Sequence, residues 1–292
     1  MEISDLIIFQ SVAKQGSVSG AARQLNYVQS NVTARIKQLE KELHTSLFYR
    51  HSRGMTLTPE GKRLLEYSDK IIFTMKEMQS AFQDPDHPAG NVEIGTVETV
   101  FRLPQILSVY YHRYPMVDLS LVTGVTEELV QDVINHRLDG AFVTGPVIHP
   151  QIVQHEAFEE KLVLVTHKSA TSPLDELTNK PLLVFGSGCG YRSKLEQWLQ
   201  LEGITPVKKI EFGTLETILG SVAAGLGITL VPESAAATFR ELGKVSAYSV
   251  PEEIGQIRTV FIRSAESFLT NSIQKFIEVI EATSKEQLSP IG

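Results

Sequence analysis

The most informative stretch of the chain is residues 17–43, whose sequence is SVSGAARQLNYVQSNVTARIKQLEKEL. Ser17 can cap a short, alanine-rich helix, and a tight turn follows at residues 26–28. From about Gln29 a second helix has apolar residues at helical spacing on one side and polar residues on the other. Two helices joined by a short turn, the second of them polar outside, match the helix-turn-helix plan, here at about residues 18–37.

The flanking segments extend this plan into a small domain followed by a long helix. A helix over residues 4–14 precedes it, and two short β-like segments flank a basic turn at residues 51–54, as in a wing. Thr58-Pro59-Glu60 is typical of a helix start, and this helix can run to about Gln83. Its apolar seam suits a helix of a second subunit, although packing on its own domain is the alternative. The seam consists of Leu64, Ser68, Ile71, Met75, Met78 and Phe82.

Beyond a linker at residues 84–90, strands and helices alternate, which indicates α/β architecture. Strands are expected at residues 92–95, 119–122, 140–143, 162–166, 182–185, 208–212 and 228–231. Helices are expected at residues 104–113, 127–137, 191–202, 215–224 and about 267–281.

Composition supports a chain of two or three globular domains. The 292 residues include a single cysteine, which excludes the disulfide-rich secreted class. The net charge of −7 divides into +4 for residues 1–63, with nine basic and five acidic residues, and −11 for the remainder. A basic head on an acidic body raises the question of nucleic-acid contact. The acidic start lacks the basic region of a signal peptide, and no apolar stretch approaches membrane-spanning length, so a cytoplasmic protein is expected.

Several motifs in order resemble the LysR-type transcriptional regulators, over nearly the whole chain. They are residues 21–30 (AARQLNYVQS), 35–40 (RIKQLE), 47–50 (LFYR), 57–61 (LTPEG) and 222–232 (VAAGLGITLVP). One departure is Val28, which stands where many family members carry a serine that caps the recognition helix. Asn26 or the Gln29 side chain could replace that cap.

The resemblance implies an α/β protein with an N-terminal winged helix-turn-helix over residues 1–58 and a linker and dimerisation helix over 59–90. Residues 91–292 would form an effector domain similar to periplasmic binding proteins. Its two α/β subdomains are expected at about 91–160 with 266–292, and at about 161–265. The implied partners are double-stranded promoter DNA, a small-molecule effector of unknown identity and further copies of the chain, as a homodimer or homotetramer. RNA polymerase is a further candidate partner, and no membrane, cofactor, metal or catalytic residue is expected.

Candidate DNA contacts lie on the second helix and the wing. A helix in the major groove reads base edges with short polar or bidentate side chains. The outward residues of that type, together with the two wing arginines suited to phosphate or the minor groove, are Gln29, Ser30, Asn31, Thr33, Arg35, Arg50 and Arg53.

Candidate effector contacts follow the strands of the α/β region, because α/β sheets bind ligands in the loops after their strands. Hydroxyls and backbone N–H groups at helix starts there suit a small anion, although Glu98 argues against one and plain helix capping explains Thr126 and Ser187 equally well. The expected set is Thr96, Glu98, Thr99, Thr126, Thr144, Ser187 and Gly188.

Two alternatives concern the loop at residues 186–190. Its glycines follow a strand and precede a helix, with Glu211 about 20 residues on, so a dinucleotide-dependent enzyme with an accessory DNA-binding head is one alternative. Ser193 at the third-glycine position weakens it, and the eight histidines lack metal-ligand spacing. A redox-sensing regulator using Cys189 is the other, but a resolving cysteine is missing.

Overall fold

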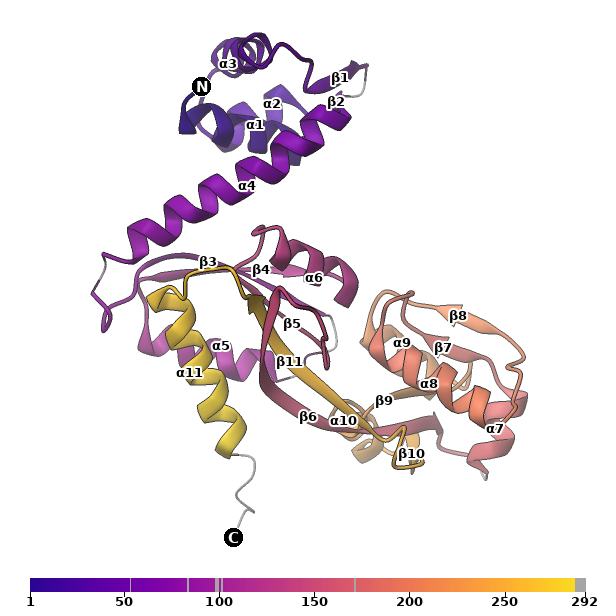
Figure 1. The fold of residues 1–292 in the computed structure, drawn as a ribbon. Helices are drawn as coiled ribbons and strands as arrows, with labels where there is room; N and C mark the ends of the chain where they lie inside the picture. Colours follow the sequence, from indigo (N-terminus) through magenta and orange to yellow (C-terminus); the bar gives the residue numbers. More distant parts are fainter. Residues whose placement is uncertain (53, 83, 98–99, 101, 171, 287–292) are drawn as a thin grey trace. The chain divides into compact units, whose positions relative to one another are not determined.

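The computed structural model describes residues 1–52, 54–82, 84–97, 100, 102–170 and 172–286 (Figure 1). These residues form two compact units. The first comprises Met1–Gln83 with the short segments Asn135–Arg137 and Ser267–Thr270, and the second comprises the rest.

The first unit is a helix-turn-helix followed by a two-stranded wing and a long helix. Its elements are α1 (Ile3–Gln15), α2 (Val18–Gln24), α3 (Gln29–Glu42), β1 (Phe48–His51), β2 (Gly54–Leu57) and α4 (Pro59–Ser80). Ser17 caps α2 by accepting a hydrogen bond from the N–H of Gly20, as the sequence predicts. The expected wing is confirmed, since β1 and β2 pair antiparallel.

The core of the first unit lies between α1, α2 and α3. Val32, Ile36 and Leu39 line the inner face of α3 and are fully or almost fully buried. Ala21 and Ala22 of α2 are also buried, and such small side chains let neighbouring helices approach closely. The burial of one face of α3 therefore leaves the opposite face to solvent.

The helix α3 begins without a side-chain cap. Val28 occupies the N-cap position, and its carbonyl accepts hydrogen bonds from the N–H groups of Asn31 and Val32. Asn26 adopts a left-handed conformation with φ of 55° in the turn between the helices. Neither Asn26 nor Gln29 replaces the serine cap, since α3 begins without a hydrogen bond from its first turn to a capping side chain. The turn and the core packing therefore fix where this helix starts.

The helix α4 begins as predicted, with the Thr58 hydroxyl accepting a hydrogen bond from Gly61 N–H at 2.9 Å. Its first turns pack on the helix-turn-helix core through Leu64 and Leu65, and Asp69 accepts a hydrogen bond from Gln10 of α1 at 2.6 Å. The alternative of packing on its own domain is therefore correct for this first part. Large apolar side chains elsewhere on the helix are exposed, namely Tyr67, Ile71 and Met78, and so is Phe82 just beyond its end.

The second unit contains a seven-stranded mixed sheet and a separate two-stranded sheet. The long sheet has the order β10-β6-β11-β5-β3-β4, with β9 also paired to β6, and β7 pairs with β8. The strands are β3 (Gly90–Thr96), β4 (Val117–Thr123), β5 (Gly140–Gly145), β6 (Ile152–His167), β7 (Leu182–Val184), β8 (Lys209–Glu211), β9 (Thr229–Pro232), β10 (Val245–Ser249) and β11 (Gln256–Ser264). The helices are α5 (Leu103–Arg113), α6 (Thr126–Ile134), α7 (Pro173–Asn179), α8 (Gly190–Leu201), α9 (Leu215–Ala223), α10 (Glu233–Glu241) and α11 (Asn271–Glu286).

The second unit has two halves, the first of which contains β3, β4, β5, β11 and the start of β6 with the helices α5, α6 and α11. Alternation along the strands explains how helices cover both faces of this first half. Ala141 and Val143 of β5 face a cluster with Leu129 and Val133 of α6. Phe142 points to the other face, where its ring lies 6.0 Å from that of Phe276 in α11. The helices α5 and α11 accordingly lie together on one side of the sheet and α6 on the other (Figure 1).

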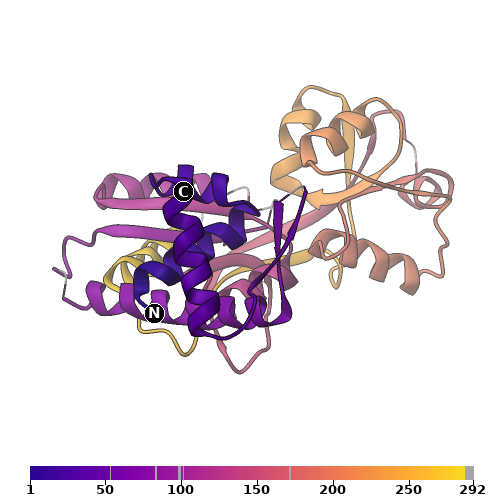
Figure 2. The ribbon, with the colours of Figure 1, turned by 90° about the horizontal axis from the view of Figure 1, so that it is seen from above.

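The strand β6 passes from the first half of the unit to the second. Its early residues pair with β11, whereas its later residues pair with β10 and β9. A register shift opposite Thr259 and Val260 leaves Ala157 as an extra residue, a β-bulge, where β11 also pairs with β5. Figure 2 shows the second half as a lobe of its own, reached by these strands.

The sequence underestimates this crossing. Only residues 162–166 of β6 are expected as a strand, and β10, β11, α7 and α10 are not predicted. Because β11 already pairs with β5 from Arg258 onward, the first half resumes near residue 256 rather than at 266. The last helix also starts later than expected, at Asn271.

Candidate functional site

The exposed face of α3 carries a run of polar side chains at its start. Gln29, Ser30 and Asn31 are exposed, directly before the buried Val32. Thr33 is half-buried, and its hydroxyl donates to the carbonyl of Gln29 at 2.8 Å, one turn back. Amide and hydroxyl groups of this kind can donate to and accept from base edges in the major groove.

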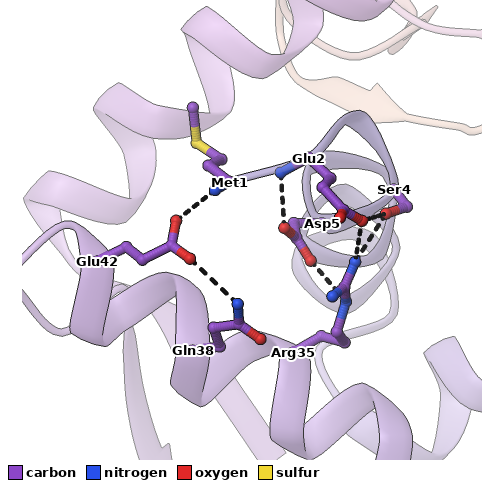
Figure 3. A network of polar contacts seen from close by, with 7 residues as sticks. All are labelled: Met1, Glu2, Ser4, Asp5, Arg35, Gln38 and Glu42. Atoms are coloured by element: carbon purple, nitrogen blue, oxygen red, sulfur yellow. Dashed lines mark hydrogen bonds and ion pairs between the residues drawn. The ribbon is translucent and has the colours of Figure 1, made fainter.

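Arg35 is engaged within the protein. Its guanidinium donates to Glu2 Oε2 at 2.6 Å and to Ser4 Oγ at 2.9 Å, and its Nε lies 2.7 Å from Asp5 Oδ1 (Figure 3). The Glu2 carboxylate raises the pKa of Arg35, and the hydrogen bond from Arg35 lowers the pKa of Glu2. Sequence reasoning misses these contacts, since they join residues about thirty positions apart. The expectation that Arg35 contacts DNA stays a prediction with a competing role beside it.

The wing presents Arg50, whose side chain is 48% exposed. Its nearest acidic partner is Glu40 of α3, at 3.6 Å. The other oxygen of Glu40 accepts the Leu47 N–H at 2.9 Å, so this carboxylate connects α3 to the start of the wing. Arg53 lies outside the described residues.

A cavity of about 270 Å³ opens between the two halves of the second unit. The end of β5 and the loops that follow β3, β4, β7 and β8 supply most of its lining. The apolar part of that lining is Val97, Val125, Phe185 and Phe212. Thr144, Gly188 and Cys189 also line it. Because the residues come from both halves, a ligand here contacts both.

A more polar recess of about 600 Å³ adjoins this cavity and shares Thr144, Gly188 and Gly190 with it. Its charged lining residues are Glu127, Lys194, Glu252, Glu253 and Arg258. Thr126, at the start of α6, also lines it, and the buried Thr126 hydroxyl has no hydrogen-bond partner among the described residues. The recess can therefore offer a hydroxyl and charges of both signs to a ligand.

The structure brings together only part of the predicted effector set. Thr126, Thr144 and Gly188 lie at the cavity and recess, whereas Thr96 and Ser187 are absent from the described lining of both. Thr96 is buried, and its hydroxyl donates to the carbonyl of Val97 at 3.0 Å. Glu98 and Thr99 lie outside the described residues. Sequence reasoning misses Phe185 and Phe212 as lining residues, although each is the last residue of an expected strand.

The dinucleotide-enzyme alternative uses Glu211 as its acidic residue, but the structure pairs this carboxylate within the protein. Glu211 accepts a hydrogen bond from Arg192 of α8 at 2.6 Å, and Arg192 also donates to the carbonyl of Phe185. The hydrogen bond to Glu211 raises the pKa of Arg192. The Glu211 carboxylate thus joins β8 to α8.

A cluster of metal ligands or a membrane-spanning helix would indicate another class of protein. No group of three or more His, Cys, Asp or Glu side chains could hold a metal ion within the part of the chain that the structure describes. Among those same residues, no helix is both long enough and apolar enough to cross a membrane.

Two family models match the chain, one in each unit. The bacterial regulatory helix-turn-helix model of the lysR family matches residues 3–62, and the LysR substrate binding domain model matches residues 85–285. The chain belongs to the LysR family of transcriptional regulators. It is therefore a LysR-type DNA-binding regulator with an effector-binding domain, and the family is one of regulators rather than enzymes.

Full-length relatives agree with this assignment. The HTH-type transcriptional regulator CzcR of Bacillus anthracis is 58% identical over 281 residues, covering 96% of this chain and 97% of the relative. The HTH-type transcriptional regulator SoxR of Arthrobacter sp. (strain TE1826) is 59% identical over 281 residues, with the same coverage of 96% and 97%.

Solved LysR-family structures share the fold. A full-length OxyR variant from Pseudomonas aeruginosa superposes with a TM-score of 0.73 at 20% identity, covering 97% of this chain and 94% of the other. Full-length CbnR in complex with its target DNA gives a TM-score of 0.67 at 22% identity, covering 97% and 100%.

Proposed function

We propose that this LysR regulator reads its operator with the start of α3, steadies the complex with the wing, and changes its DNA affinity when a small molecule occupies the cavity of the second unit. The observation that carries the proposal is the run of exposed amide and hydroxyl side chains on α3, whose opposite face is fixed in a packed core. A DNA target also implies action in the cytoplasm.

The proposed division of labour on DNA follows from side-chain chemistry. Gln29, Ser30 and Asn31 read base edges, each good bidentate contact contributing about 1–3 kcal/mol of discrimination. Thr33 contributes through its methyl group, because its hydroxyl is bonded to the helix backbone. Arg50, and Arg53 beyond it, supply charge to phosphates without reading sequence.

The proposed effector has an apolar body and a polar end. The apolar body fits the cavity beside Phe185 and Phe212, and the polar end reaches Thr126, Lys194 and Arg258 in the recess. Among the described residues that line the inner cavity, Glu128 is the only charged one, which disfavours burying an anion there. A ligand that contacts both halves favours one arrangement of them. Control by the ligand requires that it bind this arrangement with a different affinity from the other arrangement.

Self-association through α4 completes the proposal. The exposed Tyr67, Ile71, Met78 and Phe82 side chains would be covered by a second copy of the chain, giving a homodimer or homotetramer. Two DNA-binding heads then suit an operator with dyad symmetry.

Fluorescence anisotropy tests the DNA part. The protein is titrated onto the DNA upstream of its own gene and onto a random duplex, at two salt concentrations. We expect selective binding whose affinity falls steeply with salt. Equally weak binding to both duplexes, and to further candidate promoters, would refute the proposal.

A glycine variant tests the cavity. A Cβ atom at residue 190 would lie 2.6 Å from both Oγ1 and Cγ2 of Thr144, so Gly190→Ala narrows the cavity. Metabolites that shift the operator affinity of the wild type should lose that effect on this variant while its basal DNA binding is kept. Gly220→Ala is the matched control, since its Cβ would meet nothing within 4 Å.

A further inference from the structure

The recognition helix α3 is fastened to the start of α1 by polar contacts that converge on one guanidinium. Arg35 lies one helical turn beyond Asn31, and it binds Glu2, Ser4 and Asp5 together (Figure 3). Ser4 in turn donates to Glu2 Oε2 at 3.2 Å. The Arg35 side chain is only 26% exposed, so most of its surface is used by contacts within the protein.

Asp5 makes this attachment energetically important. Its side chain is 3% exposed, and its Oδ2 accepts the backbone N–H of Glu2 at 2.8 Å. The other oxygen, Oδ1, is buried and is compensated by the Arg35 ion pair at 2.7 Å. A buried carboxylate that loses its cation keeps the cost of dehydration without the attraction that offsets it. Moving the guanidinium out to a DNA phosphate would incur that cost.

The direction of these bonds also matters. Val32, Ile36 and Leu39 hold α3 to the core by apolar contacts, which are not directional. Charge-assisted hydrogen bonds have defined geometry, so the Arg35 contacts fix the rotation of α3 about its own axis. That rotation decides where Gln29 and Asn31 point.

We propose that Arg35 is a positioning residue for operator recognition, which sets the rotation of α3 against α1 through Glu2, Ser4 and Asp5 and does not itself contact DNA. The inference rests on the proposed use of α3 for base reading.

The test compares Arg35→Gln, Arg35→Lys and Asp5→Asn with the wild-type chain, by anisotropy on operator and random duplex over a series of salt concentrations. Arg35→Gln should weaken operator binding about tenfold and change random-duplex binding less than about twofold, because lost orientation removes base readout but not phosphate contacts. Asp5→Asn should weaken operator binding in the same direction, although it removes a negative charge.

The lysine variant separates the two roles of Arg35. Lysine keeps the charge for a phosphate but cannot hold three partners in the fork geometry of a guanidinium. We expect Arg35→Lys to lose operator selectivity as Arg35→Gln does, with an unchanged dependence of affinity on salt. Lys37→Gln is the matched control, since Lys37 is exposed on the same helix.

A direct phosphate contact gives the opposite pattern and would overturn the proposal. Arg35→Gln would then weaken both duplexes, reduce the slope of log affinity against log salt by about 0.9, and be rescued by lysine. A base contact would also overturn it, with selectivity lost at a single base pair and Asp5→Asn without effect. Circular dichroism of each variant sets an assay temperature at which all are folded. If the wild type itself shows no selective binding, the proposed function fails instead.

Discussion

The carbonyl oxygen of Gly16, which ends α1, accepts a hydrogen bond from the backbone N–H of Met55 at 2.7 Å. This bond fixes the second strand of the wing to the helix-turn-helix core. The neighbouring Gly54 approaches the same oxygen so closely that a Cβ atom there would lie 2.4 Å from it. The position of the wing thus depends on the lack of a side chain at residue 54.

Gly54→Ala should destabilise the first unit and weaken DNA binding. Its φ of 139° lies where side chains are rarely tolerated, and the clash with Gly16 adds to the backbone cost, so we expect a loss of about 1–3 kcal/mol. Thermal unfolding followed by circular dichroism measures the loss, and anisotropy measures the affinity. Gly90→Ala is the control, because Gly90 has φ of 104° and open space around it. An equal effect of both substitutions would show that the contact with Gly16 is unimportant.

Glu160→Gln should stabilise the second unit at neutral pH. Glu160 is 8% exposed, and burial raises the pKa of its carboxyl, although the hydrogen bond from Ser234 partly opposes this. A carboxyl group whose pKa is raised on folding destabilises the folded state increasingly as the pH rises above 4.5, the ordinary pKa of glutamic acid. We expect a gain of about 0.5–1 kcal/mol at pH 7.5 that vanishes near pH 4.

Urea denaturation followed by fluorescence measures this gain, because Trp198, the only tryptophan of the chain, lies in the core of the second unit. Glu156→Gln is the control on the same strand, since Glu156 is exposed. A loss of stability in Glu160→Gln at pH 7.5 would contradict the expected cost of the buried charge.

His155→Gln should make the second unit less sensitive to mild acid. Burial lowers the pKa of His155, and the charge of Arg263 lowers it further, while Glu281 opposes both. The folded state therefore resists protonation of His155. The wild type loses stability as the pH falls from 6.5, the ordinary pKa of histidine, through the lower pKa that His155 has in the folded state. Denaturation at pH 7.5 and pH 5 should show a smaller difference for the variant. Equal differences would mean that His155 does not carry this pH dependence.

Cys189→Ser should leave the DNA affinity unchanged in the presence of peroxide, as in its absence. Cys189 lines the cavity, but it is the only cysteine of the chain, so no intramolecular disulfide can form. Anisotropy of wild type and variant, with and without peroxide, measures the response. A peroxide response that the wild type shows and the variant lacks would revive the redox-sensing alternative.

The sequence predicts the first unit well because its contacts are local. Helical spacing, the cap at Ser17 and the Thr58-Pro59 start lie within single segments, and each is found where expected. The crossing strands escape prediction because β11 pairs with residues a hundred positions earlier, and such pairing leaves no periodic signal in a single sequence. The contacts of Arg35 escape it for a similar reason. A polar residue on an outer face looks available until the distant carboxylates that bind it are placed.

The strands β6 and β11 run side by side where the chain passes between the halves of the second unit, and the chain crosses there without a flexible linker. Such a hydrogen-bonded ribbon resists bending, except where the bulge at Ala157 interrupts its pairing. Any change in the arrangement of the two halves therefore has to be accommodated by this ribbon, because paired strands join them.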